Sequence, residues 1–138
     1  MAGERSPIWN TNAKGVFFGL DYAKNKGSII RAAMEGVAFS LRHNIETAAE
    51  AGVSPRSMNL VGGIANSPVW MQILADVTGL NLYSPSSDTG TNLGAAILAG
   101  VKPSADLGKR YKPVTRPEYE KNYAVYKELY TSLKHLMK

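Results

Sequence analysis

The first hundred residues alternate short apolar runs with longer stretches of helical periodicity. Each apolar run is β-prone and bounded by glycine or polar residues, which indicates a strand. Between the runs, apolar residues recur at steps of three and four, which indicates a helix with one buried face. The strands are predicted at residues 15–20, 58–61 and 80–83, and the helices at residues 28–51, 67–79 and 93–101. This β-α-β-α-β-α order with short connections predicts a mostly parallel sheet covered by helices.

The second predicted strand leads directly into a glycine pair, Gly62 and Gly63. Ser67 and Pro68 then mark a helix start, with the serine as N-cap and the proline at the first helical position. A flat ligand could lie against bare main chain here, because no Cβ stands in the way. A second small-residue element follows at residues 90–100. Two such helix starts in succession favour a nucleotide site, while turns needed only for packing remain the alternative for either one alone.

Residues 102–138 follow a different pattern. Residues 102–117 contain three prolines and no periodicity, which predicts a linker. The chain then ends in a helix with a largely aromatic row, which we expect to dock on the domain with its tyrosine hydroxyls at the wet edge. A coiled-coil seam and a base-stacking ladder are the alternatives. The row consists of Tyr119, Tyr123, Tyr126, Tyr130, Leu133 and Met137.

The composition is that of one globular domain. The chain has 138 residues, 44% of them hydrophobic and 20% charged, which suffices for a core. Cysteine is absent, which excludes disulfide scaffolds, thiolate zinc sites and cysteine nucleophiles. No apolar run is long enough to span a bilayer, and the first residues lack the apolar core of a secretory signal. We therefore expect a cytoplasmic protein without a membrane partner.

The net charge of +5 comes entirely from the end of the chain. Residues 1–101 hold equal numbers of basic and acidic side chains, whereas residues 102–138 hold nine Lys or Arg and four Asp or Glu. A nucleic-acid interface would gather its cations on one face beside groove-reading or aromatic residues. Here the cations are spread along a loop and one helix, so we predict a solvated surface and no nucleic-acid partner.

Several motifs, met in order along the chain, resemble the FGGY family of carbohydrate kinases, in its xylulokinase and gluconokinase branches. The run 15–20, followed after seven residues by 28–35, resembles the C-terminal signature of that family. The tyrosine-rich final helix is similar to the usual end of these kinases. The other matching segments are residues 3–9, 13–15, 72–76 and 93–96, the pairs Gly62-Gly63 and Ser67-Pro68, and Trp70. The resemblance therefore covers nearly the whole chain.

Two positions depart from the family pattern. Residue 28 is serine, where the family usually has His, Asp, Glu, Asn or Gln. Lys14 stands where arginine is commoner, a change that matters only where arginine would make a bidentate contact. Neither departure changes the assignment.

The family is built from two domains of the actin-like ATPase (ribonuclease H-like) fold, with ATP and sugar bound between them. The resemblance implies an α/β fold, a partial domain of that kind with a C-terminal docking helix. Residues 1–101 would be the C-terminal portion of the second domain, its adenosine-binding half, and residues 102–138 a linker and a helix packing on the same domain. By motif position, Gly63 and Ser67 would contact the nucleotide. Gly62 and Asn66 would shape the turn around it.

The resemblance also implies that the transfer chemistry lies outside this chain. In the family, the aspartate base for the sugar hydroxyl and the first phosphate loop, Asp-x-Gly-Thr between two strands, belong to the first domain. Asp88 begins a run with those letters, but a predicted helix follows it, so we expect an N-cap. The resemblance thus implies ATP and Mg²⁺ as cofactors, with the Mg²⁺ ligands in the missing part. No catalytic residue and no metal ligand is predicted here.

Other candidates for chemistry are weak. Glu35 is charged within a mainly apolar helix, and we expect it to pair with Arg31, one helical turn earlier. His43 has no carboxylate or cysteine at metal-ligand spacing, His135 lies in the last turn of the final helix, where a cation is favourable, and no Walker loop occurs.

The functional prediction is the ATP-binding part of a sugar kinase, acting on a xylulose- or gluconate-type substrate and inactive alone. The alternative is a standalone module that binds a nucleotide or a protein without catalysis. The expected partners are an adenine nucleotide and, mainly through the missing N-terminal domain, a sugar. Without the strands that would pair with residues 16–19, an apolar surface is expected to be uncovered, and self-association through it is predicted.

Overall fold

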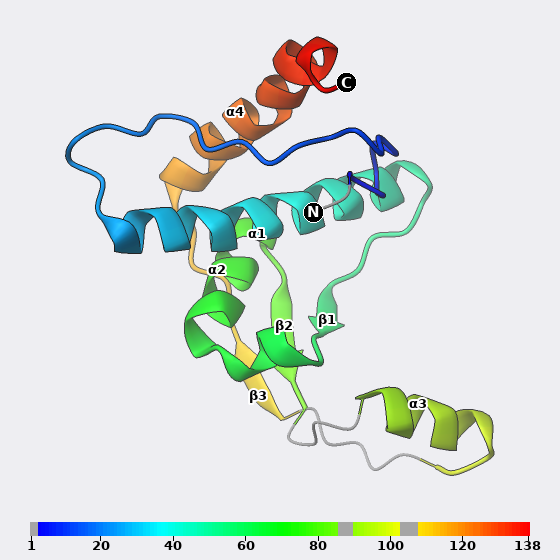
Figure 1. Ribbon diagram of the computed structural model, residues 1–138. Coiled ribbons are helices and arrows are strands. Elements are labelled where there is room, and N and C mark those ends of the chain that lie inside the picture. Colours follow the sequence, from blue (N-terminus) through cyan, green and yellow to red (C-terminus); the bar gives the residue numbers. More distant parts are fainter. Residues whose placement is uncertain (1–2, 86–89, 103–107) are drawn as a thin grey trace. The chain divides into compact units, whose positions relative to one another are not determined.

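The computed structural model describes residues 3–85, 90–102 and 108–138 (Figure 1). Two compact units are present, and each is described by itself. Unit 1 comprises Met1–Ser54 with Thr115–Lys138, and unit 2 comprises Pro55–Val114. The elements are α1 (Lys26–Glu50), β1 (Ser57–Asn59), the 3₁₀ turn η1 (Gly63–Asn66), α2 (Pro68–Thr78), β2 (Asn81–Ser84), α3 (Gly90–Leu98), β3 (Lys109–Tyr111), α4 (Pro117–Leu133) and the 3₁₀ turn η2 (Lys134–Leu136). The predicted cap at Asp88 lies outside the described residues.

Unit 2 contains a sheet of three strands in the order β1-β2-β3 (Figure 1). β1 and β2 are parallel, with Met58 opposite Leu82, as the β-α-β pattern predicts. β3 pairs antiparallel with β2, where Tyr111 lies opposite Leu82. The prediction of a linker throughout residues 102–117 is therefore wrong at this strand. β3 has no apolar alternation of its own, and its pairing with β2 makes it a strand.

α2 begins and ends where its sequence predicts. The Ser67 side chain accepts a hydrogen bond from the backbone N–H of Trp70, Pro68 occupies the first turn, and Gly79 ends the helix in the left-handed conformation with φ 70°. Local capping chemistry is sufficient for both boundaries. The helix buries Met71, Ile73, Leu74, Ala75 and Val77. It contacts β2 and β3, so these side chains and the buried Leu82 form the core of unit 2.

In unit 1, α1 and α4 pack through aromatic rings. Phe39 of α1 is only 6% exposed. Its ring centroid lies 6.3 Å from that of Tyr119, 5.8 Å from that of Tyr123 and 5.7 Å from that of Tyr126. The tyrosine row is therefore the face by which α4 packs on α1, as its spacing predicts, and the burial of these rings holds the helix pair together.

α1 begins two residues before the predicted start. The sequence suggests Ser28, the first residue of the predicted helix, as its N-cap, and this is wrong. Asn25 caps the helix instead, because its side-chain oxygen accepts a hydrogen bond from the backbone N–H of Ser28. The expected pairing of Glu35 is confirmed, since Arg31 Nε donates to Glu35 Oε1 over 2.8 Å. Arg31 also donates to the Tyr119 hydroxyl over 2.7 Å, so this arginine connects α1 to α4.

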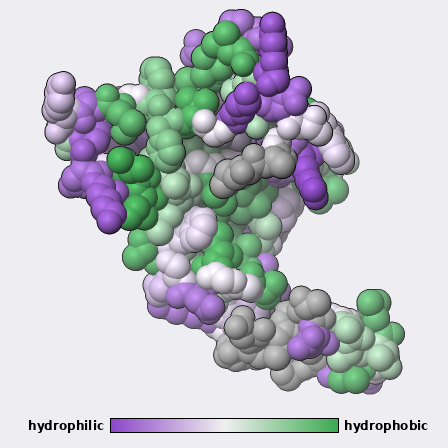
Figure 2. All heavy atoms as spheres, in the orientation of Figure 1, coloured by the Kyte–Doolittle hydropathy of each residue, from purple (hydrophilic) through white to green (hydrophobic). Residues whose placement is uncertain are grey.

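The strand predicted at residues 15–20 is wrong, because this segment is not a strand in the structure. It belongs to the stretch that runs back along α1 before the helix begins (Figure 1). A strand requires a neighbour to accept and donate backbone hydrogen bonds, and no neighbour in the described part of the chain does so. Apolar side chains consequently reach the surface here, as Figure 2 shows for the region around this segment and the start of α1.

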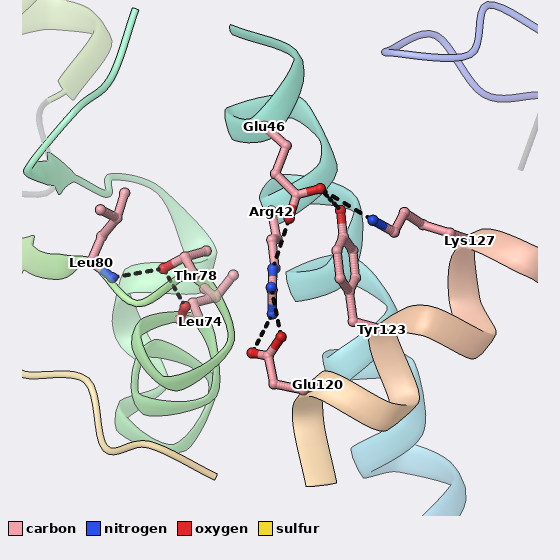
Figure 3. A network of polar contacts seen from close by, with 8 residues as sticks. All are labelled: Arg42, Glu46, Leu74, Thr78, Leu80, Glu120, Tyr123 and Lys127. Atoms are coloured by element: carbon pink, nitrogen blue, oxygen red, sulfur yellow. Dashed lines mark hydrogen bonds and ion pairs between the residues drawn. The ribbon is translucent and has the colours of Figure 1, made fainter. Parts of the chain in front are cut away.

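A network of charged groups joins α1 to α4 beside the aromatic contact (Figure 3). Arg42 makes a bidentate pair with Glu120, at 2.7 and 2.9 Å, and a further bond of 3.1 Å to Glu46. The hydroxyl of Tyr123 donates to Glu46 over 2.7 Å. Burial would raise the pKa of Glu46, but the bonds from Tyr123 and Arg42 and the positive charges of Lys127 and Arg42 outweigh it and lower that pKa. The pKa of Glu120 is lowered chiefly by its bond to Arg42.

We expect Phe39→Ala to lower the free energy of unfolding of the full chain by about 3 kcal/mol, because it leaves a cavity among three aromatic rings. Urea denaturation followed by circular dichroism measures the change. Val37→Ala is the matched control on the same helix, since Val37 is 42% exposed, and it should cost no more than about 0.5 kcal/mol. Equal losses for the two variants would contradict this account of the core.

The charged network should make stability depend on pH. Because the pKa values of Glu46 and Glu120 are lowered in the folded state, their contribution is present above the ordinary glutamate pKa of about 4.3 and is lost as the pH falls through the folded-state value. Arg42→Met should cost about 1 kcal/mol or less at pH 7, since both carboxylates are partly solvated. It should also flatten the decline in urea midpoint between about pH 5 and pH 3.

Arg56→Met is the control for the loss of one positive charge, because Arg56 has no ion pair in the described structure. It should leave the slope of the urea midpoint against pH unchanged. The same flattening in both variants would show that net charge, and not the network, causes the effect.

Candidate functional site

The glycine pair forms a tight turn between β1 and α2. Backbone pairing continues one residue past β1, where the N–H of Leu60 donates to the carbonyl of Tyr83 over 2.8 Å. Gly62 then has φ 82° and ψ −165°, a conformation open essentially to glycine alone. Its carbonyl accepts the N–H of Ala65 over 3.0 Å, which starts η1. The fold itself therefore requires the glycine at position 62.

Gly63 differs from Gly62 in this respect. Its φ lies outside the left-handed region, and a Cβ built on it would meet no atom within 4 Å. A side chain at position 63 would thus cost the described structure neither strain nor a clash. The space beside the turn is open, and a ligand lying against the backbone there would touch Gly63 directly.

Several backbone donors surround this open space. A helix start is expected to offer free N–H donors, but the Trp70 N–H is taken by Ser67 Oγ at 3.3 Å. The N–H groups of Gly63, Ile64 and Val69, in contrast, have no acceptor within the described part of the chain. The side chain of Asn66 is exposed and makes no hydrogen bond there either. The turn can therefore offer hydrogen-bond donors to the acceptor atoms of a ligand.

The end of β2 also reaches this turn. Ser84 Oγ donates to the carbonyl of Ala65 over 3.4 Å, which ties β2 to η1. Because parallel strands end at the same edge of a sheet, Ser84 lies beside the predicted residues Gly62, Gly63 and Asn66. Sequence reasoning did not single out Ser84. The usable signal was its position as the last residue of the next strand in the β-α-β pattern.

The turn carries no sign of acid–base or metal chemistry. All of the described groups with shifted pKa values belong to α1 and α4. Among residues 3–85, 90–102 and 108–138, no three His, Cys, Asp or Glu side chains lie together to hold a metal ion. The described residues of the turn therefore do not fit Mg²⁺, whose protein ligands are mainly carboxylate oxygens. What the turn presents to a ligand is exposed backbone with hydrogen-bond donors.

A cavity of about 460 Å³ lies in unit 1, away from the turn in sequence. Its lining includes Lys14, His43 and Tyr130. Lys14 Nζ donates to the backbone carbonyl of Lys138 over 3.3 Å, and the Tyr130 hydroxyl accepts from Asn10 over 3.0 Å. The Nδ1 of His43 has no hydrogen-bond partner among the described residues. It is buried, so a molecule in the cavity would not contact it directly. Lys14 and Tyr130 thus already bond within unit 1, whereas the turn has backbone donors without an acceptor in the described chain, and we take the turn as the candidate.

None of the described helices is both long and apolar enough to cross a membrane. The family model for the C-terminal domain of the FGGY family of carbohydrate kinases matches residues 1–102. The chain belongs to the FGGY family. The family resemblance of the sequence motifs is thereby confirmed.

Relatives of the FGGY chain include two kinds of sugar kinase. It is 42% identical over 102 residues to xylulose kinase from Escherichia coli (strain K12), a match that covers 73% of this chain and 21% of that protein. It is 32% identical over 147 residues to gluconokinase from Bacillus subtilis (strain 168), covering 99% of this chain and 29% of that protein. The chain thus spans less than a third of the length of these relatives.

The fold class is confirmed by solved structures. Ligand-bound xylulose kinase from Lactobacillus acidophilus matches with a TM-score of 0.79 and 28% identity, over 96% of this chain and 30% of that one. The predicted α/β fold, a partial actin-like ATPase domain, is therefore correct as a class. The differences in detail are the missing strand at residues 15–20 and the additional antiparallel β3.

The two glycines of the turn should respond differently to substitution. Gly62→Ala forces a side chain into the left-handed region and should cost about 1–3 kcal/mol of unfolding free energy. Gly63→Ala is the matched neighbour and should change stability by no more than about 0.5 kcal/mol, since its Cβ meets open space. Thermal and urea denaturation of both variants measure this, and a Gly63→Ala loss as large as that of Gly62→Ala would contradict the geometry.

Proposed function

We propose that this chain is the C-terminal, adenosine-binding part of a kinase that transfers the γ-phosphate of ATP to a hydroxyl of a xylulose- or gluconate-type sugar. The observation that carries the proposal is Gly63. The described fold would accept a side chain at position 63, whereas a ligand lying against the backbone of the turn requires that no side chain be there. The xylulose kinases and gluconokinases among the relatives support the reaction and the substrate class.

The nucleotide would lie on the turn at the carboxyl ends of β1 and β2. Gly63 provides the close approach, and Gly62 and Asn66 shape the turn around it. Ser67 uses one acceptor lone pair as the N-cap of α2, which leaves its hydroxyl proton available to the nucleotide. The unpartnered N–H groups of Gly63 and Ile64 face no competing acceptor in the described chain.

The remaining requirements of phosphoryl transfer belong to the region that the relatives carry outside the matched segment. ATP and Mg²⁺ are the proposed cofactors, and Mg²⁺ neutralises charge on the transferred phosphoryl group when it is bound. In this proposal the sugar is held mainly by the missing region, residues 1–101 are the adenosine-binding half, and residues 102–138 are the linker and docking helix. The 138 residues alone turn over no substrate, and the complete enzyme works in the cytoplasm.

A second candidate function is a standalone module that binds a nucleotide or a protein without catalysis. The uncovered apolar residues of unit 1 favour it, because such surfaces mark interaction sites. Self-association through that surface is part of our proposal. Weak binding of adenine nucleotides without phosphoryl transfer is expected under both functions, whereas tight binding of a partner protein by the 138-residue chain would favour the second.

Titration calorimetry with ADP tests the proposed function. The 138-residue chain should bind ADP weakly, and Gly63→Leu should weaken binding at least tenfold, because the side chain fills the space of the ligand. Gly36→Leu is the matched control, since Gly36 also faces open space at an ordinary φ, and it should bind as the unsubstituted chain does. No ADP binding, or equal affinity in Gly63→Leu, would overturn the proposal.

A further inference from the structure

The glycine turn is linked to the neighbouring strand through one carbonyl group. η1 is a single 3₁₀ turn of four residues, and so short a turn has little stability of its own. Its start is closed by the bond from the Ala65 N–H to the Gly62 carbonyl over 3.0 Å. The Ala65 carbonyl, in turn, accepts the hydroxyl of Ser84 over 3.4 Å. In the part of the chain that the structure describes, no other donor reaches this carbonyl.

The environment of this link makes its loss local. Ala65 and Ser84 are both half-buried. A half-buried carbonyl that loses its donor must turn toward water to regain a hydrogen bond, and this peptide lies only two residues after Gly63. The bond is also longer than the usual O–H···O distance of about 2.7–2.8 Å, so its contribution to the stability of the whole unit is small. Removal of the hydroxyl should therefore disturb the turn and leave the sheet intact.

The backbone of Ser84, in contrast, is firmly placed. Ser84 is paired with Lys109 of β3 on one side of β2. On the other side, the carbonyl of its neighbour Tyr83 accepts the N–H of Leu60 over 2.8 Å. Gly108 has φ 59° and runs so close to β2 that a Cβ on it would collide with the carbonyl oxygen of Ser84. The hydroxyl that reaches η1 thus projects from a fixed point of the sheet.

We propose that Ser84 is a positioning residue of the nucleotide site, whose hydroxyl holds η1 so that the backbone at Gly63 stays open to the ligand. The inference rests on the proposed function for the identity of that ligand, an adenine nucleotide. Ser84 acts through Ala65 and not by touching the nucleotide. A turn that is already held in the binding conformation loses less freedom when the ligand arrives, and the affinity is higher for that reason.

Amide hydrogen exchange, measured by NMR on the ligand-free 138-residue chain, tests the positioning without any nucleotide. In Ser84→Ala, the Ala65 N–H should exchange at least about threefold faster, because η1 opens more often once its link to β2 is lost. The N–H groups in the middle of α2 should keep their rates, since the buried face of that helix is untouched.

Ser57→Ala is the matched control for the loss of a strand serine. Ser57 is the first residue of β1, at the opposite edge of the sheet from the turn, and it is exposed. Its side chain makes no hydrogen bond in the described structure. Ser57→Ala should leave the exchange rate of the Ala65 N–H unchanged.

Titration calorimetry with ADP tests the consequence for binding. Ser84→Ala should bind ADP about three- to fivefold more weakly, the effect of losing one modest hydrogen bond. Ser84→Thr keeps the hydroxyl on a residue that suits a strand and should bind within about twofold of the unsubstituted chain. A serine that only stabilised the fold would lower the urea midpoint of Ser84→Ala without changing the ADP affinity of the folded protein.

Three results would overturn the proposal. They are an unchanged exchange rate of the Ala65 N–H in Ser84→Ala, an unchanged ADP affinity in that variant, and an equal loss of affinity in Ser84→Thr. Absence of ADP binding in every chain, the unsubstituted one included, would overturn the proposed function. The exchange experiment would then still decide whether Ser84 holds the turn, so the two failures are distinguishable.

Discussion

The parallel pairing of β1 with β2 is the constraint on which the candidate site depends. Parallel strands require a crossover, and here the crossover contains the glycine turn, η1 and α2. Because both strands end at the same edge, the turn after β1 lies next to Ser84 at the end of β2. The packing of α2 on β2 and β3 then holds the start of the helix, and with it Ser67, beside the open space. A slip in the pairing of β1 with β2 would move the turn away from Ser84.

The two glycines of the turn differ in whether the fold requires them. Gly62 has a backbone conformation that a side chain would strain, so its presence is explained by the fold alone. Gly63 has neither strain nor a close neighbour, so the described fold does not require glycine there. The sequence presents both as one pair, and only their backbone torsion angles distinguish them.

In unit 1, several large apolar residues are not part of a core. α1 has 25 residues, yet only Ala38 and Phe39 are buried, where α4 packs on it. The aromatic contact and the Arg42 network stabilise the middle of the helix. The start of the helix and the run at residues 15–20 remain exposed. In the described chain these apolar residues therefore form a surface and not a core.

The amino-acid sequence by itself determined the features that depend on neighbours along the chain. Ser67, Pro68 and Gly79 set the ends of α2, and the periodic tyrosines set the packing face of α4, because capping and helical spacing act within a few residues. For two segments, only the tertiary structure decided whether a strand forms. Residues 15–20 have strand composition and no partner, whereas residues 109–111 have little strand character and pair with β2. The physical reason is that a strand is completed by hydrogen bonds to a distant segment, and composition alone does not reveal whether that segment is present.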